Sequence, residues 1–469
     1  MPPLVSARRL SRDLGEWRTS GPSYRALADR IRVLLLDGRL GSGARLPAER
    51  ELCQALEVSR TTVAAAYAQL RDDGYLVSVR GSGSTIALPG GARGQQPSGA
   101  DLPLDFTKAT SPAYPGLAAA YQQAADLVPR YLGHHGFDMT GLPELREAIA
   151  QHYRDRGLAT APEQIMVTVG AQHALNLIAQ TLYSPGERIL VEHPTYPHAL
   201  DTFAASGARM LPVPVTTGGG WDLAEAQLLI RRAAPSLAYL MPDFHNPTGM
   251  SMAPAERERV ALLAQREGTV LVADETTALL DIDRGVLPPL ASYSSSVVTI
   301  GSLGKLVWGG LRIGWIRGPQ ELMGKLLRNR PAVDLGTPLF EQLVATILLR
   351  QLPSLVANRS RELRSGRDQL VGLLRETLPA WKLHVPDGGM TLWINTGTVS
   401  TSALALAARS EGLAIVPGPR FGLDGAFERF LRLPFSHGSE ELAEAVGILA
   451  RAAARADGTE LRVPVQSVI

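Results

Sequence analysis

The sequence has little cysteine and no long apolar run. Cys53 is the one cysteine among 469 residues, which excludes an intrachain disulfide and fits a reducing compartment. There is no apolar stretch of the roughly 18 residues that a membrane-spanning helix needs. The charged N-terminal residues also lack the apolar run of a signal peptide. These absences predict a soluble, cytoplasmic protein.

Lysine is scarce as well. The chain contains Lys108, Lys305, Lys325 and Lys382 and no other lysine. Any chemistry that requires a lysine amine therefore has four candidates. Hydrophobic residues make up 45% of the chain and charged residues 20%, which is typical of a globular protein with ample material for a core. The length favours more than one domain.

Charge and composition divide the chain into two parts. Residues 1–90 contain 13 arginines, no lysine and 9 acidic residues, a local balance of +4, although the whole chain carries a net charge of only +2. Such a modest basic excess fits a nucleic-acid-binding module without requiring one. Residues 87–104 are rich in glycine, proline and small polar residues, which is linker composition. We predict one domain over 1–88, a linker over 89–104 and a second domain over 105–469.

Three helical patterns and a short β pattern fill the first domain. Ser23 and Ser59 are placed to cap the first and third helices, and a second short helix follows Pro47. Alternating runs at 75–79 and 84–88 surround a turn of glycine and serine, which is typical of a hairpin. This order of elements predicts a winged helix-turn-helix of the α+β class.

The third helix would present DNA-binding side chains at its N-terminal end. A capping serine, an arginine and two threonines stand there and supply donors for phosphates and base edges at the end that enters a major groove. Further arginines flank the second helix and the hairpin tip. Taken singly, each of these arginines could be an ordinary surface residue. The predicted DNA-binding set is Arg45, Arg50, Ser59, Arg60, Thr61, Thr62, Arg80 and Gly81.

Together these residues resemble the GntR-type winged helix-turn-helix. The matching segments are 41–52, 58–63, 66–70, 74–76 and 81–83. The resemblance implies contact with a double-stranded DNA operator through Arg45, Arg50, Arg60, Thr61 and Thr62. One departure is Ala48, where the family usually has a serine that caps the second helix, and the loss of that cap costs about 1 kcal/mol.

After residue 104 the pattern changes to an alternation of β and α segments. Apolar β-branched runs occupy 165–169, 188–192, 237–241, 270–273 and 297–300, with helical patterns between them. Buried continuous strands between helices predict a mainly parallel sheet covered on both faces, hence an α/β domain. Beyond about Pro353, a long helix and short strands predict a small α+β subdomain over 353–469. The fold class is therefore multidomain.

Lys305 follows one of these runs, in the sequence Ser302-Leu303-Gly304-Lys305, and Arg312 comes seven residues later. A lysine amine can hold an aldehyde covalently, and an arginine can bind its phosphate with two charged hydrogen bonds. Asp274 ends another apolar run, where a carboxylate needs a cationic partner such as a pyridinium N–H. Alone, Lys305 could equally be a surface lysine. With Asp274 it points to a site for pyridoxal phosphate (PLP).

Further residues complete the predicted cofactor pocket. Asn246 offers an amide to the phenolic oxygen of the ring, Tyr196 can stack on the ring, and Ala171 and Gln172 open a helix whose N–H groups bind phosphate. We expect no metal. The predicted cofactor set is Lys305, Asp274, Asn246, Tyr196, Ala171, Gln172, Ser302, Arg312 and Thr276.

With segments 141–150 and 185–187, this half resembles the fold-type I aminotransferases, and the fusion of both halves resembles the MocR subfamily of GntR regulators. The resemblance implies a fold-type I aminotransferase-like domain that senses PLP or an amino-group ligand. It also implies that Arg432 binds the α-carboxylate of an amino compound and that homodimers form head to tail.

Two departures from the aminotransferase pattern bear on turnover. A tyrosine usually stands two or three residues after the aspartate, whereas this chain has Thr276 and Thr277, and the sequence leaves open which of them replaces it. Phe137 lies near the position from which a partner's tyrosine commonly reaches the phosphate. Because both losses remove hydrogen bonds, we expect weak or absent transamination. The alternatives are an active aminotransferase with a DNA-binding module, and a regulator whose scaffold holds no cofactor.

Overall fold

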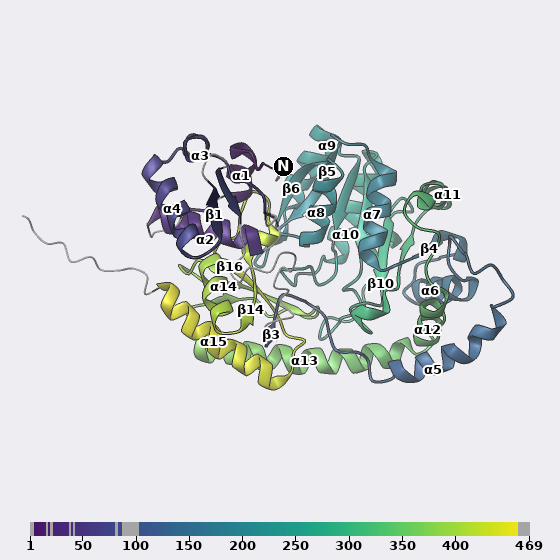
Figure 1. The fold of residues 1–469 in the computed structure, drawn as a ribbon. Helices are drawn as coiled ribbons and strands as arrows, with labels where there is room; N and C mark the ends of the chain where they lie inside the picture. Colours follow the sequence, from purple (N-terminus) through teal and green to yellow (C-terminus); the bar gives the residue numbers. More distant parts are fainter. Residues whose placement is uncertain are drawn as a thin grey trace, which may run out of the picture.

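The structure is a computed structural model that describes residues 4–15, 17–18, 22–36, 39–40, 43–79, 83–86 and 103–457. Two of the predicted DNA-binding residues, Arg80 and Gly81, lie outside the described residues, as does most of the expected linker. Figure 1 shows an N-terminal helical part beside a larger body that is built around a sheet.

The N-terminal part is a winged helix-turn-helix. Its elements are α1 (Ala7–Leu14), α2 (Ser23–Leu36), α3 (Glu49–Leu56), α4 (Arg60–Asp72), β1 (Leu76–Val79) and β2 (Gly83–Ile86), with β1 and β2 antiparallel. A single apolar cluster joins all four helices and the hairpin. The predicted helices and hairpin are confirmed, but Ser23, which we expected to cap the first helix, is itself the first residue of α2. The sequence patterns did not predict α1, which Ser6 caps by accepting a hydrogen bond from the Arg9 N–H.

The larger body contains an eight-stranded sheet in the order β4-β11-β10-β9-β8-β5-β6-β7. The strands are β4 (Ile165–Thr168), β5 (Arg188–His193), β6 (Arg209–Thr216), β7 (Gly220–Trp221), β8 (Leu237–Leu240), β9 (Val270–Asp274), β10 (Val298–Ser302) and β11 (Gly314–Arg317). The stretch β10-β9-β8-β5-β6 is parallel, while β11 is antiparallel to both of its neighbours and β7 is antiparallel to β6. The prediction of a mainly parallel sheet is confirmed.

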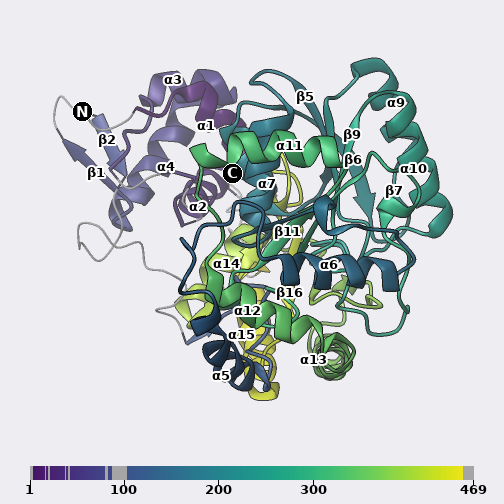
Figure 2. The same ribbon diagram turned by 90° about the vertical axis from the view of Figure 1, so that its right-hand side faces the viewer.

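Helices cover both faces of this sheet because alternate strand residues enter different apolar clusters. Met166 packs in the cluster that holds α7 and α8, whereas Val167 packs in the cluster that holds α6 and α12. The helices are α5 (Leu117–Leu127), α6 (Pro143–Asp155), α7 (Ala171–Leu182), α8 (Pro197–Ala205), α9 (Leu223–Ala233), α10 (Pro254–Arg266), α11 (Gln320–Asn329) and α12 (Leu339–Leu349). Figure 2 shows α6 and α7 at different depths of this body.

The C-terminal part forms the small subdomain. Its elements are α13 (Leu352–Thr377), β12 (Lys382–Leu383), β13 (Thr391–Asn395), α14 (Thr401–Ser410), β14 (Leu413–Ala414), β15 (Val416–Pro417), the 3₁₀ turn η7 (Gly418–Phe421), β16 (Phe430–Pro434) and α15 (Ser439–Asp457). The strand β3 (Leu104–Asp105) pairs with β14. Leu104, which we expected to end the linker, therefore belongs to this domain, because its backbone bonds fix it there.

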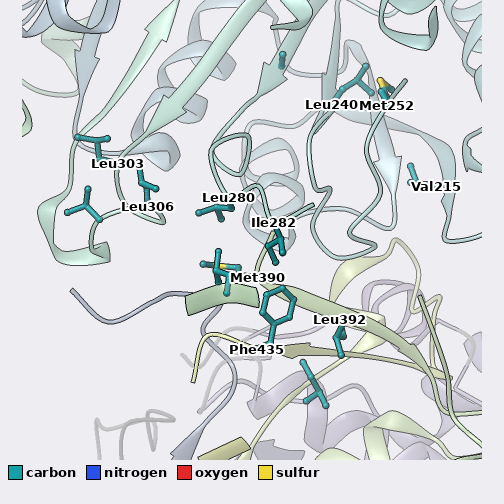
Figure 3. Close-up of a cluster of buried hydrophobic side chains, with 14 of the residues drawn as sticks. Val215, Leu240, Met252, Leu280, Ile282, Leu303, Leu306, Met390, Leu392 and Phe435 are labelled. Carbon is teal, nitrogen blue, oxygen red and sulfur yellow. The ribbon is translucent and has the colours of Figure 1, made fainter. Parts of the chain in front are cut away.

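A shared core joins the small subdomain to the sheet. Figure 3 shows Met390 and Phe435 of the small subdomain facing Leu280 and Ile282, which follow β9. The sheet domain and the small subdomain therefore share one apolar core. In the described ranges no single helix is long and apolar enough to cross a membrane, although α12 and α13, which meet at a bend of 83°, satisfy that test as a pair.

Candidate cofactor pocket and DNA-binding edge

A cavity of about 170 Å³ opens where β9 and β10 end and α7 begins. Eight of the nine predicted cofactor residues line it, and Asn246 is the exception. The sequence patterns missed several lining residues that carry no chemical signature of their own, namely Thr110, Leu175, Met241, Gly304 and Gly309. The topology thus brings together side chains that are more than 140 positions apart in the chain, from Ala171 to Arg312.

Lys305 lines this cavity, with Nζ 5.9 Å from the centre of the Tyr196 ring. Burial lowers the pKa of the Lys305 ammonium, and Arg432 lowers it further, while Asp274 opposes them. Burial also raises the pKa of Tyr196 to about 12, and Asp274 adds to this effect. A lysine whose pKa is lowered holds a larger fraction of neutral, nucleophilic amine at a given pH.

Asp274 is held from two sides. The Tyr239 hydroxyl on β8 donates to Asp274 Oδ2 at 2.6 Å, and the Thr276 N–H donates to Oδ1 at 3.0 Å. Tyr239 is fully buried, so this carboxylate is anchored for a cationic ring nitrogen. The sequence patterns missed Tyr239, because it reads as one apolar residue of a buried strand.

The two threonines that follow Asp274 have different surroundings. Thr276 lines the cavity, whereas the Thr277 hydroxyl donates to the Asp243 carbonyl at 2.7 Å. Thr277 is therefore occupied by a backbone bond, and Thr276 is the residue of the two that faces the pocket. Phe137, the other departure, is 72% exposed.

The opposite end of the cavity suits a phosphate. Gly170 is the N-cap residue of α7 and supplies no side-chain cap, so the first N–H groups of the helix are open to a ligand. A Cβ atom on Gly170 would lie 2.9 Å from Arg312 Nη2, and the Gly170 φ is +80°. The guanidinium of Arg312 thus lies directly over the start of α7. Ser302 Oγ donates to the Ile313 carbonyl at 2.9 Å and accepts from the Gly304 N–H at 3.0 Å.

Arg432, on β16, does not line the cavity, but its charge acts on Lys305 and Tyr196. Its side chain is buried, donates to the Thr107 carbonyl and lies with Cζ 5.2 Å from the centre of the Phe421 ring. Burial lowers the pKa of Arg432 to about 10. A buried guanidinium of this kind is well suited to a ligand carboxylate.

Three buried polar atoms in this region have no hydrogen-bond partner among the described residues: Asn246 Oδ1, Gln172 Oε1 and Arg432 Nε. Each unpartnered buried group costs roughly 1–3 kcal/mol, so a ligand that satisfies them is favoured. A lysine amine whose pKa is lowered, an anchored carboxylate, a stacking ring and an uncapped helix beside an arginine match the aldehyde, ring nitrogen, ring face and phosphate of PLP. The residues present therefore fit this cofactor.

The DNA-binding residues predicted from the sequence lie around the start of α4. Ser59 Oγ accepts from the Thr62 N–H at 3.1 Å, and Arg60 and Thr61 are exposed beside it. Arg50 is exposed on α3, and Arg45 forms β-bridges with Leu4 and Thr85 next to the hairpin. These predicted residues therefore lie on or near the helix-turn-helix and its hairpin.

The helix α3 keeps one of the two hydrogen bonds of a capping box, although Ala48 stands at its N-cap position. The Ala48 N–H donates to Glu51 Oε2 at 3.3 Å, so the glutamate three positions on satisfies one backbone donor while the missing serine leaves another without a side-chain acceptor.

Comparison with known proteins gives two family matches. Residues 118–449 match the family described as aminotransferase class I and II, and residues 23–86 match the bacterial regulatory proteins of the gntR family.

Individual relatives cover the whole fusion or its larger half. The HTH-type transcriptional regulator TauR of Rhodobacter capsulatus is 30% identical over 462 residues, which is 89% of this chain and 94% of that protein. The probable rhizopine catabolism regulatory protein MocR of Rhizobium meliloti is 29% identical over 435 residues, 84% of this chain and 86% of the relative. The crystal structure of the α-aminoadipate aminotransferase LysN from Thermus thermophilus, complexed with N-(5'-phosphopyridoxyl)-L-leucine, superposes with a TM-score of 0.70 at 28% identity and covers 76% of this chain and 93% of that one.

These matches extend over both parts of the chain and agree with the geometry of the pocket. The larger part is a fold-type I, PLP-dependent aminotransferase domain, and the smaller part is a GntR-type DNA-binding domain. The chain belongs to the class I and II aminotransferase family and, as a fusion with a gntR-family domain, to the MocR-type transcriptional regulators.

Proposed function

We propose that this protein is a ligand-responsive regulator in which Lys305 holds PLP and the winged helix binds an operator. The winged helix indicates DNA binding, and the aminotransferase fold indicates a dimer and an amino-compound ligand.

One observation carries this proposal. Lys305 and Gln172 line one cavity, and the buried Oε1 atom of Gln172 has no hydrogen-bond partner among the described residues; Asn246 Oδ1 and Arg432 Nε, on residues outside the lining, are unpartnered there as well. A protein seldom leaves such groups unsatisfied unless a ligand completes them. The same chain carries a helix N-terminus of the DNA-binding type, so occupancy of the cavity has a second site on which to act.

Each residue has a role in this proposal. Bound PLP supplies an aldehyde that reacts with amino groups. Asp274 would hold a proton on the ring nitrogen, Arg312 and the start of α7 would bind the phosphate, and Tyr196 would stack on the ring. Arg432 would orient the carboxylate of an amino compound, and Lys305 would supply the amine that holds the cofactor. Either PLP itself or that compound is the effector.

Absorption spectroscopy tests the cofactor. Purified protein with added PLP should show a visible band from the lysine-bound cofactor, and Lys305→Ala should abolish it. Lys325→Ala is the matched control, because Lys325 is an exposed lysine on α11 that pairs with Glu321. A wild-type protein without a visible band, or a band that persists in Lys305→Ala, would contradict the proposal.

Transamination should be slow or absent. The Thr277 hydroxyl donates to the Asp243 carbonyl, so no hydroxyl at that position is available to the phenolic oxygen of the ring. The alternative, an active aminotransferase, is favoured by the presence of Asp274, Lys305 and Arg312 in one pocket. Steady multiple turnover of an amino donor and a keto acceptor would establish that alternative.

We further infer a cytoplasmic, head-to-tail homodimer, which accords with the DNA-binding part and the aminotransferase fold. Light scattering on the purified protein should give twice the mass of the 50.2 kDa chain. A monomer at micromolar concentration would contradict this inference.

A further inference from the structure

A second cavity, of about 750 Å³, shares no lining residue with the cofactor pocket. Three segments form its walls: the C-terminal half of α6, the loop over residues 278–286 that follows β9, and the junction of α12 with α13. Figures 1 and 2 both show α6 beside α12. Cavities that hold small molecules in proteins usually measure roughly 300–1,000 Å³, so this one is large enough for a ligand.

A bend between two helices forms one wall of this cavity. α12 ends at Leu349, α13 begins at Leu352, and the two helices meet at 83°. Pro353 stands in the first turn of α13, where its ring and its missing N–H prevent α12 from continuing as one straight helix. Leu349 and Val356, on either side of the bend, both line the cavity. This wall therefore follows from the position of one proline.

Most of the lining is apolar, and its charges balance. Alanine, leucine, valine and proline side chains predominate, while two carboxylates and two guanidiniums complete the charged lining, namely Asp155, Asp281, Arg156 and Arg350. Burial, with Arg156, lowers the pKa of His152, which also lines the cavity, to about 3. Its ring is therefore neutral near pH 7. Because the lining carries no net charge and moving a charged group out of water is costly, the cavity favours an uncharged molecule.

Arg156 gives the cavity one buried hydrogen-bond donor. Its Nη1 donates to Glu275 Oε2 at 2.7 Å, and the side chains of this pair are 7% and 2% exposed. Its Nη2 donates to the Leu287 carbonyl at 3.4 Å. Its Nε atom is buried and has no hydrogen-bond partner within the described part of the chain. A buried N–H without a partner is costly, so an acceptor on a ligand is favoured there.

We propose that this cavity is a second ligand site, which takes an uncharged, mostly apolar molecule with one hydrogen-bond acceptor, such as the carbonyl of an aromatic ketone. The carbonyl accepts from Arg156 Nε, and the hydrocarbon part packs against the apolar walls. A neutral acceptor suffices because Glu275 already balances the charge of Arg156. Glu275 directly follows Asp274 in the chain, so the regulator holds this ligand next to its cofactor pocket and apart from it.

Fluorescence titration with Prodan, a neutral naphthyl ketone whose emission shifts to the blue in apolar surroundings, tests the site in PLP-loaded protein. The wild type should give a saturable blue shift. Ala148→Trp on α6 and Ala357→Trp on α13 each place a large ring in the cavity and should weaken Prodan binding at least about 10-fold. Ala357 is exposed, so its variant tolerates the change even where Ala148→Trp fails to fold. Ala224→Trp, at an exposed position of α9 outside the lining, is the matched control and should bind as the wild type does.

Arg156→Lys tests the acceptor. Lysine keeps the charge that pairs with Glu275 but lacks Nε, so Prodan affinity should fall roughly 10-fold. The affinity for naphthalene, which has no acceptor, should stay the same when both probes are measured by equilibrium dialysis. Equal Prodan affinities for the wild type and the lysine variant would overturn the ligand class.

Two outcomes would overturn the site itself. One is the absence of saturable Prodan binding to the wild type, as expected where a second copy of the chain covers the cavity. The other is unaltered Prodan binding in both Ala148→Trp and Ala357→Trp. Neither outcome depends on the visible band of Lys305, so the cofactor assignment stands or falls separately.

Discussion

The N-termini of α4 and α7 differ in their capping. At the start of α4, Ser59 accepts a hydrogen bond from the helix, and exposed Arg60 follows it. At the start of α7, Gly170 supplies no cap, and Arg312 lies over the free end inside a cavity. The first terminus has a side-chain cap, whereas the second has none.

The difference follows from what each terminus meets. DNA is a large partner that approaches an exposed helix end, so a serine cap can keep the end folded while side chains next to it reach out. A phosphate group is small and must reach the backbone N–H groups themselves, so even a Cβ atom is an obstacle there. Changes at α7 should therefore affect ligand affinity most, and changes at α4 should divide between stability and DNA affinity.

Gly170→Ala should have the largest effect, a loss of PLP affinity at the start of α7. The new Cβ would lie 2.9 Å from Arg312 Nη2 and would displace a charged hydrogen-bond donor worth about 1.5–3 kcal/mol. We expect PLP affinity, measured by titration of the visible band, to fall roughly 10- to 100-fold.

Gly186→Ala separates backbone strain from loss of the phosphate site. Gly186 has a similar positive φ, +91°, and nothing lies within 4 Å of its Cβ. It should leave PLP affinity unchanged. Equal losses in both variants would mean that strain alone accounts for the effect and that the start of α7 does not bind phosphate.

The sequence predicts most of the sheet and most of the pocket for a shared reason. Strands such as β9 are continuous apolar runs, and chemical residues such as Asp274 stand at their ends, so local pattern and site coincide. The short strand β7, of two residues, carries no periodic signal. Its existence depends on pairing with β6, which local sequence does not encode.

Residues that act through distant contacts could not be predicted. Tyr239 is one apolar position in a buried strand until its hydroxyl meets Asp274, 35 residues later. Residues 418–428 show no period and no motif, yet they contact Leu14, Arg30 and Thr195, which lie far away in the chain. Local sequence patterns indicate secondary structure and single chemical groups. These contacts, in contrast, exist only after the winged helix, the sheet domain and the small subdomain have packed together.

Arg60→Ala tests the exposed terminus. If Arg60 meets a phosphate or a base edge, its loss should weaken binding to a DNA fragment from upstream of the gene by about 1–3 kcal/mol, roughly 5- to 150-fold. A gel shift at fixed salt measures this effect. Arg12→Ala removes the same charge from α1, where the side chain is 68% exposed, and should change affinity less. Equal affinities for the Arg60 and Arg12 variants would reject α4 as the recognition helix.

Ser59→Ala should show that the Ser59 side chain caps α4. The Thr62 N–H would lose its acceptor at 3.1 Å, and N-cap loss costs about 1 kcal/mol. Hydrogen exchange in the first turn of α4 should therefore quicken roughly 5-fold. Ser59→Gly should cost a few tenths of a kcal/mol. No change in exchange in the alanine variant would mean that packing alone holds this end.

The smallest expected effect is on the pH dependence of PLP capture by Lys305. Burial, with Arg432, lowers the pKa of Lys305, and the neutral amine is the form that captures an aldehyde. The rate of PLP capture should therefore rise with pH and level off below the ordinary lysine value of about 10.4. Arg432→Gln removes one cation that lowers the pKa of Lys305, so the plateau should move to higher pH. A capture plateau that stays in place in Arg432→Gln would show that Arg432 does not face the lysine, and the pocket would then lack the cation expected to orient a carboxylate.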